Sequence, residues 1–283
     1  MSFKQRVPDT SEDWDTYWNQ TSIKRELSIV KTDGLNPIFE KYLKKEAINI
    51  EAGCGLGKWV IALKNKGYKI IGLDTYAKGL IKLKAHDKTL KLLTGDVLSL
   101  PLESNSIDSY ISLGVVEHFE EGPQVPLREA YRSLKPGGIA FIEVPFDSPL
   151  RQINRNLFSL KVTLKSPVRI FLETLGLRQK RQQVSMRFYE YRYTQSELKK
   201  FVKQAGFKLI ELLPKDDLAS DKSISLWLDY PRLRHKNKKI FQLSQQGKII
   251  KAILHLISPF SYPALIVAVC TKPSPKKSYL ITS

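Results

Sequence analysis

A glycine-rich turn between an apolar strand pattern and a helix pattern constrains this sequence most. The turn is Glu51-Ala-Gly-Cys-Gly-Leu-Gly57; Ala47-Ile-Asn-Ile50 precedes it and Lys58-Trp-Val-Ile-Ala-Leu63 follows it. Glycines remove Cβ atoms where a backbone must pass close to a ligand, and a helix start presents the positive end of its dipole. The order of strand, turn and helix predicts the first unit of an open α/β sheet with a ligand beside the turn.

The charge of this turn distinguishes between two classes of ligand. The spacing is Gly-x-Gly-x-Gly, whereas dinucleotide sites use Gly-x-Gly-x-x-Gly, and a carboxylate stands at Glu51, two residues before the first glycine. That carboxylate would repel a pyrophosphate, but it would attract the sulfonium and ammonium of S-adenosyl-L-methionine. The turn therefore favours this methyl donor as the cofactor. The expected cofactor-binding residues here are Glu51, Gly53, Cys54, Gly55 and Gly57.

Acidic residues follow the next two predicted strands. Lys69-Ile-Ile-Gly-Leu-Asp74 ends 21 residues after Gly53, where a Rossmann-like sheet holds ribose hydroxyls, and residues 90–94 lead into Gly95, Asp96 and Val97, a position suited to adenine. A fourth strand from Ser106 reaches Leu113 at the same edge. We therefore expect Asp74, Asp96, Val97 and Leu113 to contact the cofactor as well. Helix N-caps are the alternative roles for the two aspartates.

Three more strands complete the predicted sheet. The segment Leu134-Lys-Pro-Gly-Gly138 indicates a helix end and a turn before a fifth strand that reaches Pro145. Thr194 and Glu197 form a capping box for a helix that stops at Gly206. Residues 208–213 and 264–270 are the sixth and seventh strands.

In order and spacing these elements resemble the class I S-adenosylmethionine-dependent methyltransferases. More narrowly, they are similar to the type 11 small-molecule group, which includes the ubiquinone and menaquinone methyltransferases. The matching segments are residues 51–57, Asp74, residues 95–96, residues 115–118 and residues 134–138, within a core of residues 45–146. The resemblance implies an enzyme with an α/β, Rossmann-like sheet of seven strands, mostly parallel with the last strand antiparallel, and two basic helical insertions.

His118 is the candidate catalytic residue. It follows the fourth strand, where the resemblance places the acceptor, and an imidazole can deprotonate a hydroxyl. A loop-orienting role is the alternative, since many similar enzymes carry a histidine here. Cys54 is expected to pack rather than to act as a nucleophile.

The chain divides into four stretches. Residues 1–44 form an N-terminal arm with helices, 45–146 the cofactor-binding core, 147–192 a basic insertion on the acceptor side, and 193–283 the rest of the sheet with a second basic insertion. The aromatic segment of the arm, which contains Trp18, either folds over the donor or packs on the outside of the sheet. The formal charge of +18 is concentrated in these insertions. Residues 151–192 carry ten lysines and arginines against two acids, and residues 232–251 carry seven against none.

Apolar side chains alternate with these cations, as in Phe158 to Leu172 and Ile249 to Ile257. This pattern suits docking on an anionic membrane surface; a lid over the enzyme's own cleft is the alternative. The lysines and arginines of the insertions would also attract the phosphates of RNA. However, the fourth strand lacks the Asn/Asp-Pro-Pro-aromatic loop that amino-methylating nucleic-acid enzymes share, and the sequence has no Pro-Cys nucleophile, so nucleic acid is disfavoured.

The sequence thus predicts methyl transfer, at oxygen, to a small-molecule acceptor or to a lipid- or glycan-linked one. An RNA methyltransferase is the first alternative, and a non-catalytic adaptor for a membrane or a partner is the second. Two cysteines 216 residues apart suggest neither a disulfide framework nor a metal site. With no signal peptide pattern at Met1 and an interrupted apolar run at 252–270, we expect a cytoplasmic protein, with peripheral membrane contact left open. The sequence does not indicate an oligomeric state.

Overall fold

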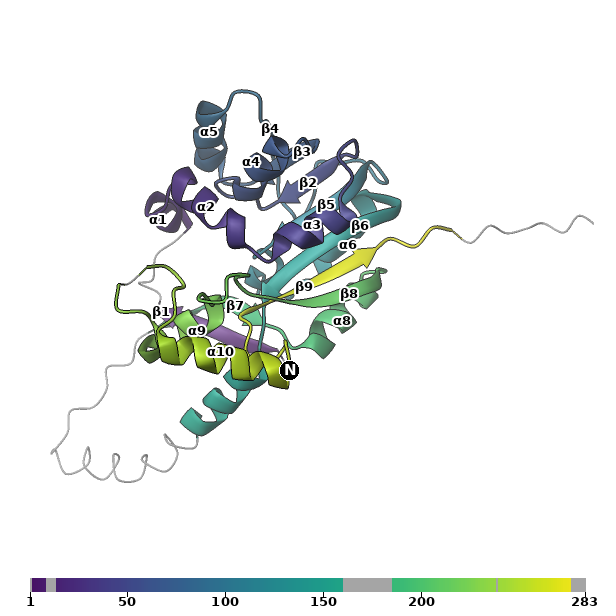
Figure 1. The fold of residues 1–283 in the computed structure, drawn as a ribbon. Coiled ribbons are helices and arrows are strands. Elements are labelled where there is room, and N and C mark those ends of the chain that lie inside the picture. Colours follow the sequence, from purple (N-terminus) through teal and green to yellow (C-terminus); the bar gives the residue numbers. More distant parts are fainter. Residues whose placement is uncertain (1, 9–13, 160–184, 238, 276–283) are drawn as a thin grey trace, which may run out of the picture.

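The computed structural model describes residues 2–8, 14–159, 185–237 and 239–275 (Figure 1). A seven-stranded sheet organises most of them, in the order β4-β3-β2-β5-β6-β9-β8. Its strands are β2 (Asn49–Ala52), β3 (Ile70–Asp74), β4 (Lys91–Thr94), β5 (Ile107–Leu113), β6 (Leu134–Pro145), β8 (Lys208–Lys215) and β9 (Leu265–Thr271). The last strand, β9, runs antiparallel to β6 and β8, while the strands from β4 to β6 pair in parallel. The predicted fold class is therefore confirmed.

Helices cover both faces of this sheet, and the strands are apolar on both faces for that reason. On one face lie α3 (Leu35–Tyr42), α4 (Lys58–Asn65) and α5 (Ala77–His86); on the other lie α6 (Gln124–Ser133) and α8 (Gln195–Gln204). Each face of the sheet has its own hydrophobic core, and consecutive residues of β6 contribute to different ones. Phe141 packs edge-on against Phe39 of α3, with ring centroids 5.2 Å apart, whereas Ile142 packs with α6 and α8. The predicted capping box of Thr194 and Glu197 begins α8.

The start of β6 differs from the sequence-based expectation. Leu134 belongs to the strand rather than to the end of the preceding helix, since its backbone is extended (φ −69°, ψ 139°) and it pairs with Ile107 of β5. An irregular register follows, with Gly137 at φ 81°. The lysine–proline–glycine turn is thus accommodated inside the strand.

A second, two-stranded sheet joins parts of the chain that are distant in sequence. β1 (Phe3–Pro8) pairs antiparallel with β7 (Met186–Arg192). From the sequence, these segments belong to the arm and to the first insertion, and no strand is predicted in either. Between β1 and the core lie α1 (Trp14–Asn19), α2 (Ile23–Ser28) and the short helix η1 (Val30–Thr32). Figure 1 shows β1 and β7 between the carboxyl edge of the main sheet and the helices at its lower end.

The two basic insertions are described to different extents. Residues 149–159 are helical, whereas residues 160–184, which contain most of the alternation from Phe158 to Leu172, lie outside the described residues. The second insertion contains α9 (Ile224–Asp229), η3 (Pro231–Leu233) and α10 (Gln245–Ile257). The helical spacing expected from Ile249 to Ile257 is confirmed by α10. Within the described ranges, no helix is both long and apolar enough to cross a membrane.

Candidate active site

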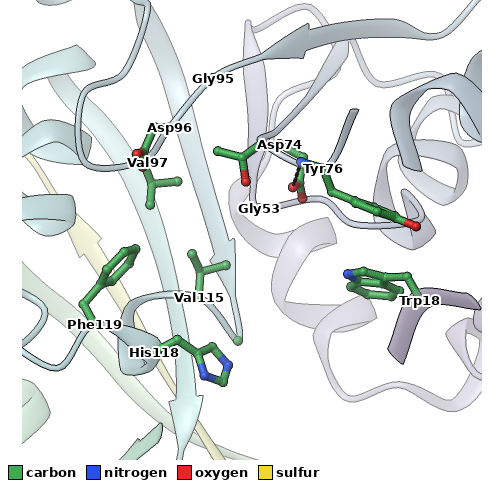
Figure 2. Close-up of a pocket in the computed structure, with 12 residues that line it drawn as sticks. Trp18, Gly53, Asp74, Tyr76, Gly95, Asp96, Val97, Val115, His118 and Phe119 are labelled. Atoms are coloured by element: carbon green, nitrogen blue, oxygen red, sulfur yellow. Dashed lines mark hydrogen bonds between the residues drawn. The ribbon is translucent and has the colours of Figure 1, made fainter. Parts of the chain in front are cut away.

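A cavity of about 510 Å³ opens at the carboxyl edge of the parallel strands. In the view of Figure 2, Asp96, Val97 and Phe119 lie on the left, Asp74, Tyr76 and Trp18 lie toward the right, and His118 lies at the bottom. Every element that lines it is a strand end, the loop after one, or the arm helix α1. The lining residues are Trp18, Gly53, Asp74, Thr75, Tyr76, Gly95, Asp96, Val97, Gly114, Val115, His118 and Phe119.

The three glycines of the turn have different roles, although all have positive φ. Gly53 lines the cavity at φ 79°, and a Cβ atom there would lie 2.4 Å from Cγ2 of Val115. Gly55 and Gly57 line neither this cavity nor the second one described below; a Cβ on either would meet Trp18 or Leu83. Gly55 therefore makes room for the arm helix, and Gly57 makes room for α5.

Backbone donors orient the carboxylate of Asp74. One oxygen accepts the N–H of Gly55 at 2.6 Å, and the other accepts the N–H of Tyr76 at 2.8 Å. A carboxylate offers about four lone-pair directions, so both oxygens keep capacity for a hydroxyl donor. The N-cap of α5 is Tyr76. The alternative role of Asp74 as a helix cap is therefore wrong.

Asp96 and Val97 line the opposite wall of the same cavity. An Asp96 oxygen accepts the N–H of Leu98 at 2.8 Å, and a bridge between Asp96 and Ser99 closes the loop. The segment that follows is thus a turn and not a helix, which also excludes the cap alternative here.

A second cavity of about 260 Å³ adjoins the first, and both are lined by Trp18, Gly53, Gly114 and His118. The predicted residues Glu51, Cys54 and Leu113 lie here rather than in the larger cavity. Four carboxyl groups line it: those of Glu26, Glu51, Glu117 and Glu143. Apart from Gly55 and Gly57, which line neither cavity, the sequence-predicted site residues thus line the cavity with Asp74 and Asp96, the acidic cavity beside it, or both.

Glu51 is buried, and its Oε2 accepts the N–H of Val60 in the first turn of α4 at 3.0 Å. Burial raises the pKa of Glu51 to about 8, against the opposing charge of Lys58. The group is therefore neutral below pH 8 in the protein alone. The attraction for a cation expected from the sequence requires Glu51 to ionise when the cation arrives.

Glu117 is also buried, and burial holds its pKa well above the ordinary value. Its Oε2 has no hydrogen-bond partner among the described residues. A buried acceptor without a donor is costly unless a ligand supplies one. Together with the tight approach of Gly53 to Val115 and the carboxylates on both walls, this atom fits a ligand with hydroxyls and a cationic tail, as S-adenosylmethionine has.

Glu143, one of the acids that line the second cavity, belongs to a buried network of ion pairs. Nζ of Lys215 lies 2.9 Å from Glu143 and 3.2 Å from Asp33, and all three side chains are almost fully buried. Burial alone would lower the pKa of Lys215, but the charges of Glu143 and Asp33 raise it. The lysine is therefore charged and anchors β8 to β6 and to the arm.

His118 faces both cavities from the short helix η2 (Val116–His118). Its Nδ1 lies 2.8 Å from the carbonyl oxygen of Tyr189 in β7. A carbonyl can only accept, so in the neutral ring the proton is on Nδ1 and Nε2 is the basic nitrogen. Burial lowers the pKa of His118, although the hydrogen bond to Tyr189 opposes the shift. The arrangement provides a neutral imidazole at pH 7.

Several residues of the site were not predicted. Tyr76, Phe119, Glu143 and Tyr189 all line the cavities. Tyr76 lies two residues after Asp74 and Phe119 directly follows His118, so proximity in sequence was a usable signal. Glu143 and Tyr189 come from other elements, and no local pattern predicts them. Trp18 lines both cavities, as expected for an arm that folds over the donor. Cys54 packs against β3, with Sγ 3.0 Å from the place of a Cβ on Gly72, and burial raises the pKa of its thiol.

The core of the chain matches a known protein family. Residues 50–142 match the family model described as "Methyltransferase domain". A probable S-adenosylmethionine-dependent methyltransferase of Mycolicibacterium smegmatis is 28% identical over 130 residues, 45% of this chain and 50% of the relative. Demethylmenaquinone methyltransferase of Staphylococcus haemolyticus is 26% identical over 182 residues, 61% of this chain and 73% of the relative.

A tRNA (carboxymethyluridine(34)-5-O)-methyltransferase of Xenopus tropicalis is 35% identical over 104 residues, 36% of this chain and 16% of the relative. The chain thus spans about half or less of the length of several curated relatives that it matches. Among solved structures, the methyltransferase from a complex with a Haloferax volcanii methyltransferase activator aligns with a TM-score of 0.58 at 18% identity, over 94% of this chain and all of that one.

Proposed function

We propose, on the premise that residues 50–142 form a methyltransferase domain of the class I fold, that this chain methylates a hydroxyl group of a small-molecule or lipid-linked acceptor. The observation that carries the proposal is the position of His118. Its basic Nε2 belongs to a neutral ring that lines both cavities, on the side where an acceptor would meet the donor.

S-adenosylmethionine is the donor, and when bound it supplies an already activated methyl group. In this proposal the carboxylate of Asp74 accepts hydrogen bonds from the ribose, and Asp96 and Val97 hold the adenine in the larger cavity. Glu51, Gly53, Cys54 and Leu113 surround the amino-acid tail in the acidic cavity. Gly55 and Gly57 act indirectly, because they let Trp18 and α5 approach the turn.

The chain's own contribution to the chemistry is orientation and one proton transfer. Holding two groups in a reactive arrangement can lower a barrier by roughly 7–11 kcal/mol. His118 takes the acceptor's hydroxyl proton on Nε2, and the carbonyl of Tyr189 keeps the ring in the required tautomer. Oε1 of Glu117 lies 3.9 Å from Nε2, so its partial negative charge stabilises the imidazolium that results. A relative named for demethylmenaquinone supports an acceptor of the quinone type.

Transfer of tritium from methyl-labelled S-adenosylmethionine to fractionated cell extracts tests the proposal. We expect label in the organic phase from a lipid extract, retained after nuclease treatment, and label that resists mild acid as a methyl ether does. Loss of transfer after nuclease treatment would show an RNA acceptor instead. That alternative draws on the tRNA relative, whose match covers 16% of its length.

Calorimetric titration with S-adenosylmethionine separates the enzyme from a non-catalytic adaptor. Saturable binding that weakens in Asp74→Ala is expected, because roughly 1.5–3 kcal/mol is associated with each hydrogen bond to a charged group. Asp74→Asn keeps one acceptor oxygen for the N–H of Gly55 or Tyr76. It is therefore the matched control that separates loss of the carboxylate from loss of the loop conformation that these hydrogen bonds hold. Absence of binding to the wild type would favour the adaptor.

A further inference from the structure

Helix α10 is amphipathic, with its apolar side turned to solvent. Its exposed apolar residues recur at helical spacing and form one stripe, which we call the α10 stripe. The exposed fractions are 53% for Ile249, 37% for Ile250, 52% for Ile253, 86% for Leu256 and 72% for Ile257. A soluble protein ordinarily buries such a stripe.

The opposite side of α10 packs on the protein through polar contacts. Nζ of Lys251 donates to the carbonyls of Asp217 and Ala219 at 3.1 and 2.9 Å, and also to that of Lys222. Gly247 is buried, and a Cβ there would lie 2.7 Å from the carbonyl oxygen of Leu233. These contacts fix the rotation of the helix, so the outward direction of the stripe is built into the fold.

An apolar groove of about 550 Å³ runs beside the stripe. It is lined by Leu150, Leu226, Asp229, Tyr230, Pro231, Arg232, Leu233, Ile250 and Leu254. Leu150 belongs to the helical segment 149–159, which exposes further apolar side chains at Ile153, Leu157 and Phe158. Figure 1 shows this segment and α10 together at the lower end of the molecule, far from α5 and β4.

Unpaired cations lie at the groove and in the loop before α10. The sequence contains no aspartate or glutamate after Asp229. Arg232 lines the groove, and Lys236 and Lys239 lie in the loop that leads into α10; all three are exposed, and none is ion-paired within the described part of the chain. By contrast, Arg151 and Arg155 pair with Asp229 and Asp147, and Arg234 stacks on Trp227, so these cations are structural.

We propose that the α10 stripe docks on the surface of an anionic lipid bilayer, with the stripe in the interface and Arg232, Lys236 and Lys239 on lipid phosphates. An exposed apolar helix face supplies burial, and flanking cations supply attraction to negative lipid. The charge complementarity favours this occupant over a second copy of the chain, whose own patch would carry the same positive charge.

The docked surface is connected to the acceptor side of the cavities. His118 contacts Tyr189 of β7; β7 pairs with β1; and the guanidinium of Arg155, in segment 149–159, stacks 4.5 Å from the ring centroid of Phe3 in β1. These contacts link segment 149–159, which contributes Leu150 to the groove, to the part of the cavities that His118 lines.

Vesicle flotation tests the docking surface, without donor or acceptor, so its outcome does not depend on the methyl-transfer proposal. The probes are vesicles of phosphatidylcholine alone and vesicles of phosphatidylcholine that contain about 30% phosphatidylglycerol, an anionic lipid. We expect flotation with the anionic vesicles, reduced by raising the salt from about 0.1 to 1 M, and little with the neutral ones. Equal flotation with both would overturn the role of the cations.

Matched variants assign the effect to residues. Leu256→Ser/Ile257→Ser should lower vesicle partition at least tenfold, whereas Ile81→Ser/Val125→Ser, at exposed apolar positions on α5 and α6, should not. Arg232→Glu/Lys236→Glu should lower it about thirtyfold, from about fivefold per cation, and Lys88→Glu/Lys91→Glu, at exposed positions before and in β4, should lower it much less.

Circular dichroism melting shows whether each variant is folded, and sedimentation measures self-association. Flotation of both α10-stripe and cation variants like the wild type would sink the proposal. So would a wild type that does not float but forms a dimer that Leu256→Ser/Ile257→Ser dissociates, since the stripe would then bind a second copy.

Discussion

Nδ1 of His118 lies 2.8 Å from the carbonyl oxygen of Tyr189, a residue 71 positions later in the chain. This contact makes the small β1–β7 sheet a part of the candidate active site, because it fixes which ring nitrogen of His118 is basic. The two rings also meet edge-on, with centroids 5.5 Å apart. His118, which follows the fourth strand in the sequence, is therefore held by a strand that is distant in the chain.

Replacement of His118 tests whether it removes the acceptor's proton. We expect His118→Gln to lower kcat by 10²- to 10⁴-fold, the range of general base catalysis, and to leave the Kd for S-adenosylmethionine within about twofold. Glutamine keeps a donor for the carbonyl of Tyr189, so the loop stays in place. A variant with wild-type kcat would show that His118 only orients the loop.

The pH profile gives the second readout of the same role. Since burial lowers the pKa of His118, the neutral base predominates above a pH that lies below 6.5, the ordinary histidine value. The wild-type rate should therefore rise with pH through an inflection on the acidic side of 6.5 and then level off. His118→Gln should lack that inflection. An inflection retained in the variant would assign it to another group.

Ionisation of Glu51 predicts proton release when the donor binds. Below its pKa of about 8 the carboxyl is protonated in the protein alone, and a cationic tail in the acidic cavity would favour the carboxylate. At pH 6.5 we expect release of nearly one proton, and donor affinity that increases as the pH rises toward 8. Titrations in two buffers of different ionisation enthalpy measure the release. Glu51→Gln should release none; equal release from both proteins would contradict the assignment.

Substitution of Gly53 tests the close approach at the turn. Gly53→Ala combines an unfavourable φ of 79° with a Cβ 2.4 Å from Val115. Gly122→Ala is the matched control, since it has a φ of 96° and nothing within 4 Å. The control should lose about 1–2 kcal/mol of unfolding free energy from backbone strain, and Gly53→Ala a further 1–3 kcal/mol from overpacking.

Relief of that clash provides an internal check. Val115→Ala removes the two Cγ atoms nearest the added Cβ, so the double variant Gly53→Ala/Val115→Ala should recover part of the loss, as a coupling of about 0.5–3 kcal/mol. Chemical denaturation measures each free energy. Additive effects of the two substitutions would mean that Val115 moves aside without strain.

The sequence predicted the elements whose signals are local. The turn at Gly53, the acid at Asp74 and the capping box at Thr194 each depend on neighbours within a few residues, and the sheet order follows from them once the resemblance is accepted. The pairing of β1 with β7 could not be predicted, because it joins segments about 180 residues apart through a register that no pattern specifies.

The electrostatic state of the site was also beyond a local pattern. The sequence predicts a negative charge at Glu51, but burial raises the pKa of this carboxyl to about 8, although the N–H of Val60 donates to it, so it is neutral below pH 8. Likewise, Arg151 is one of the ten lysines and arginines that make residues 151–192 basic, but Asp229, 78 residues later in the chain, neutralises its charge. Burial and distant partners decide both, and only the folded arrangement brings them together.

The buried network of Lys215 predicts a large loss of stability when its lysine is replaced. Lys215→Met would leave Asp33 and Glu143 buried without their shared cation, which destabilises by about 3–5 kcal/mol for a broken buried pair. Lys41→Met breaks an exposed pair with Glu211 and should change the free energy of unfolding by about 1 kcal/mol or less.

Acid sensitivity distinguishes this network from a general packing defect. Burial raises the pKa of Asp33, but Lys215 and Lys58 outweigh it and lower the pKa below the ordinary value. That contribution is complete above the unfolded pKa of about 3.9 and is lost as the pH falls below it. Denaturation at pH 7 and pH 3 should show a smaller pH-dependent loss in Lys215→Met than in the wild type. An equal loss in both would exclude Asp33 as the group that Lys215 holds ionised.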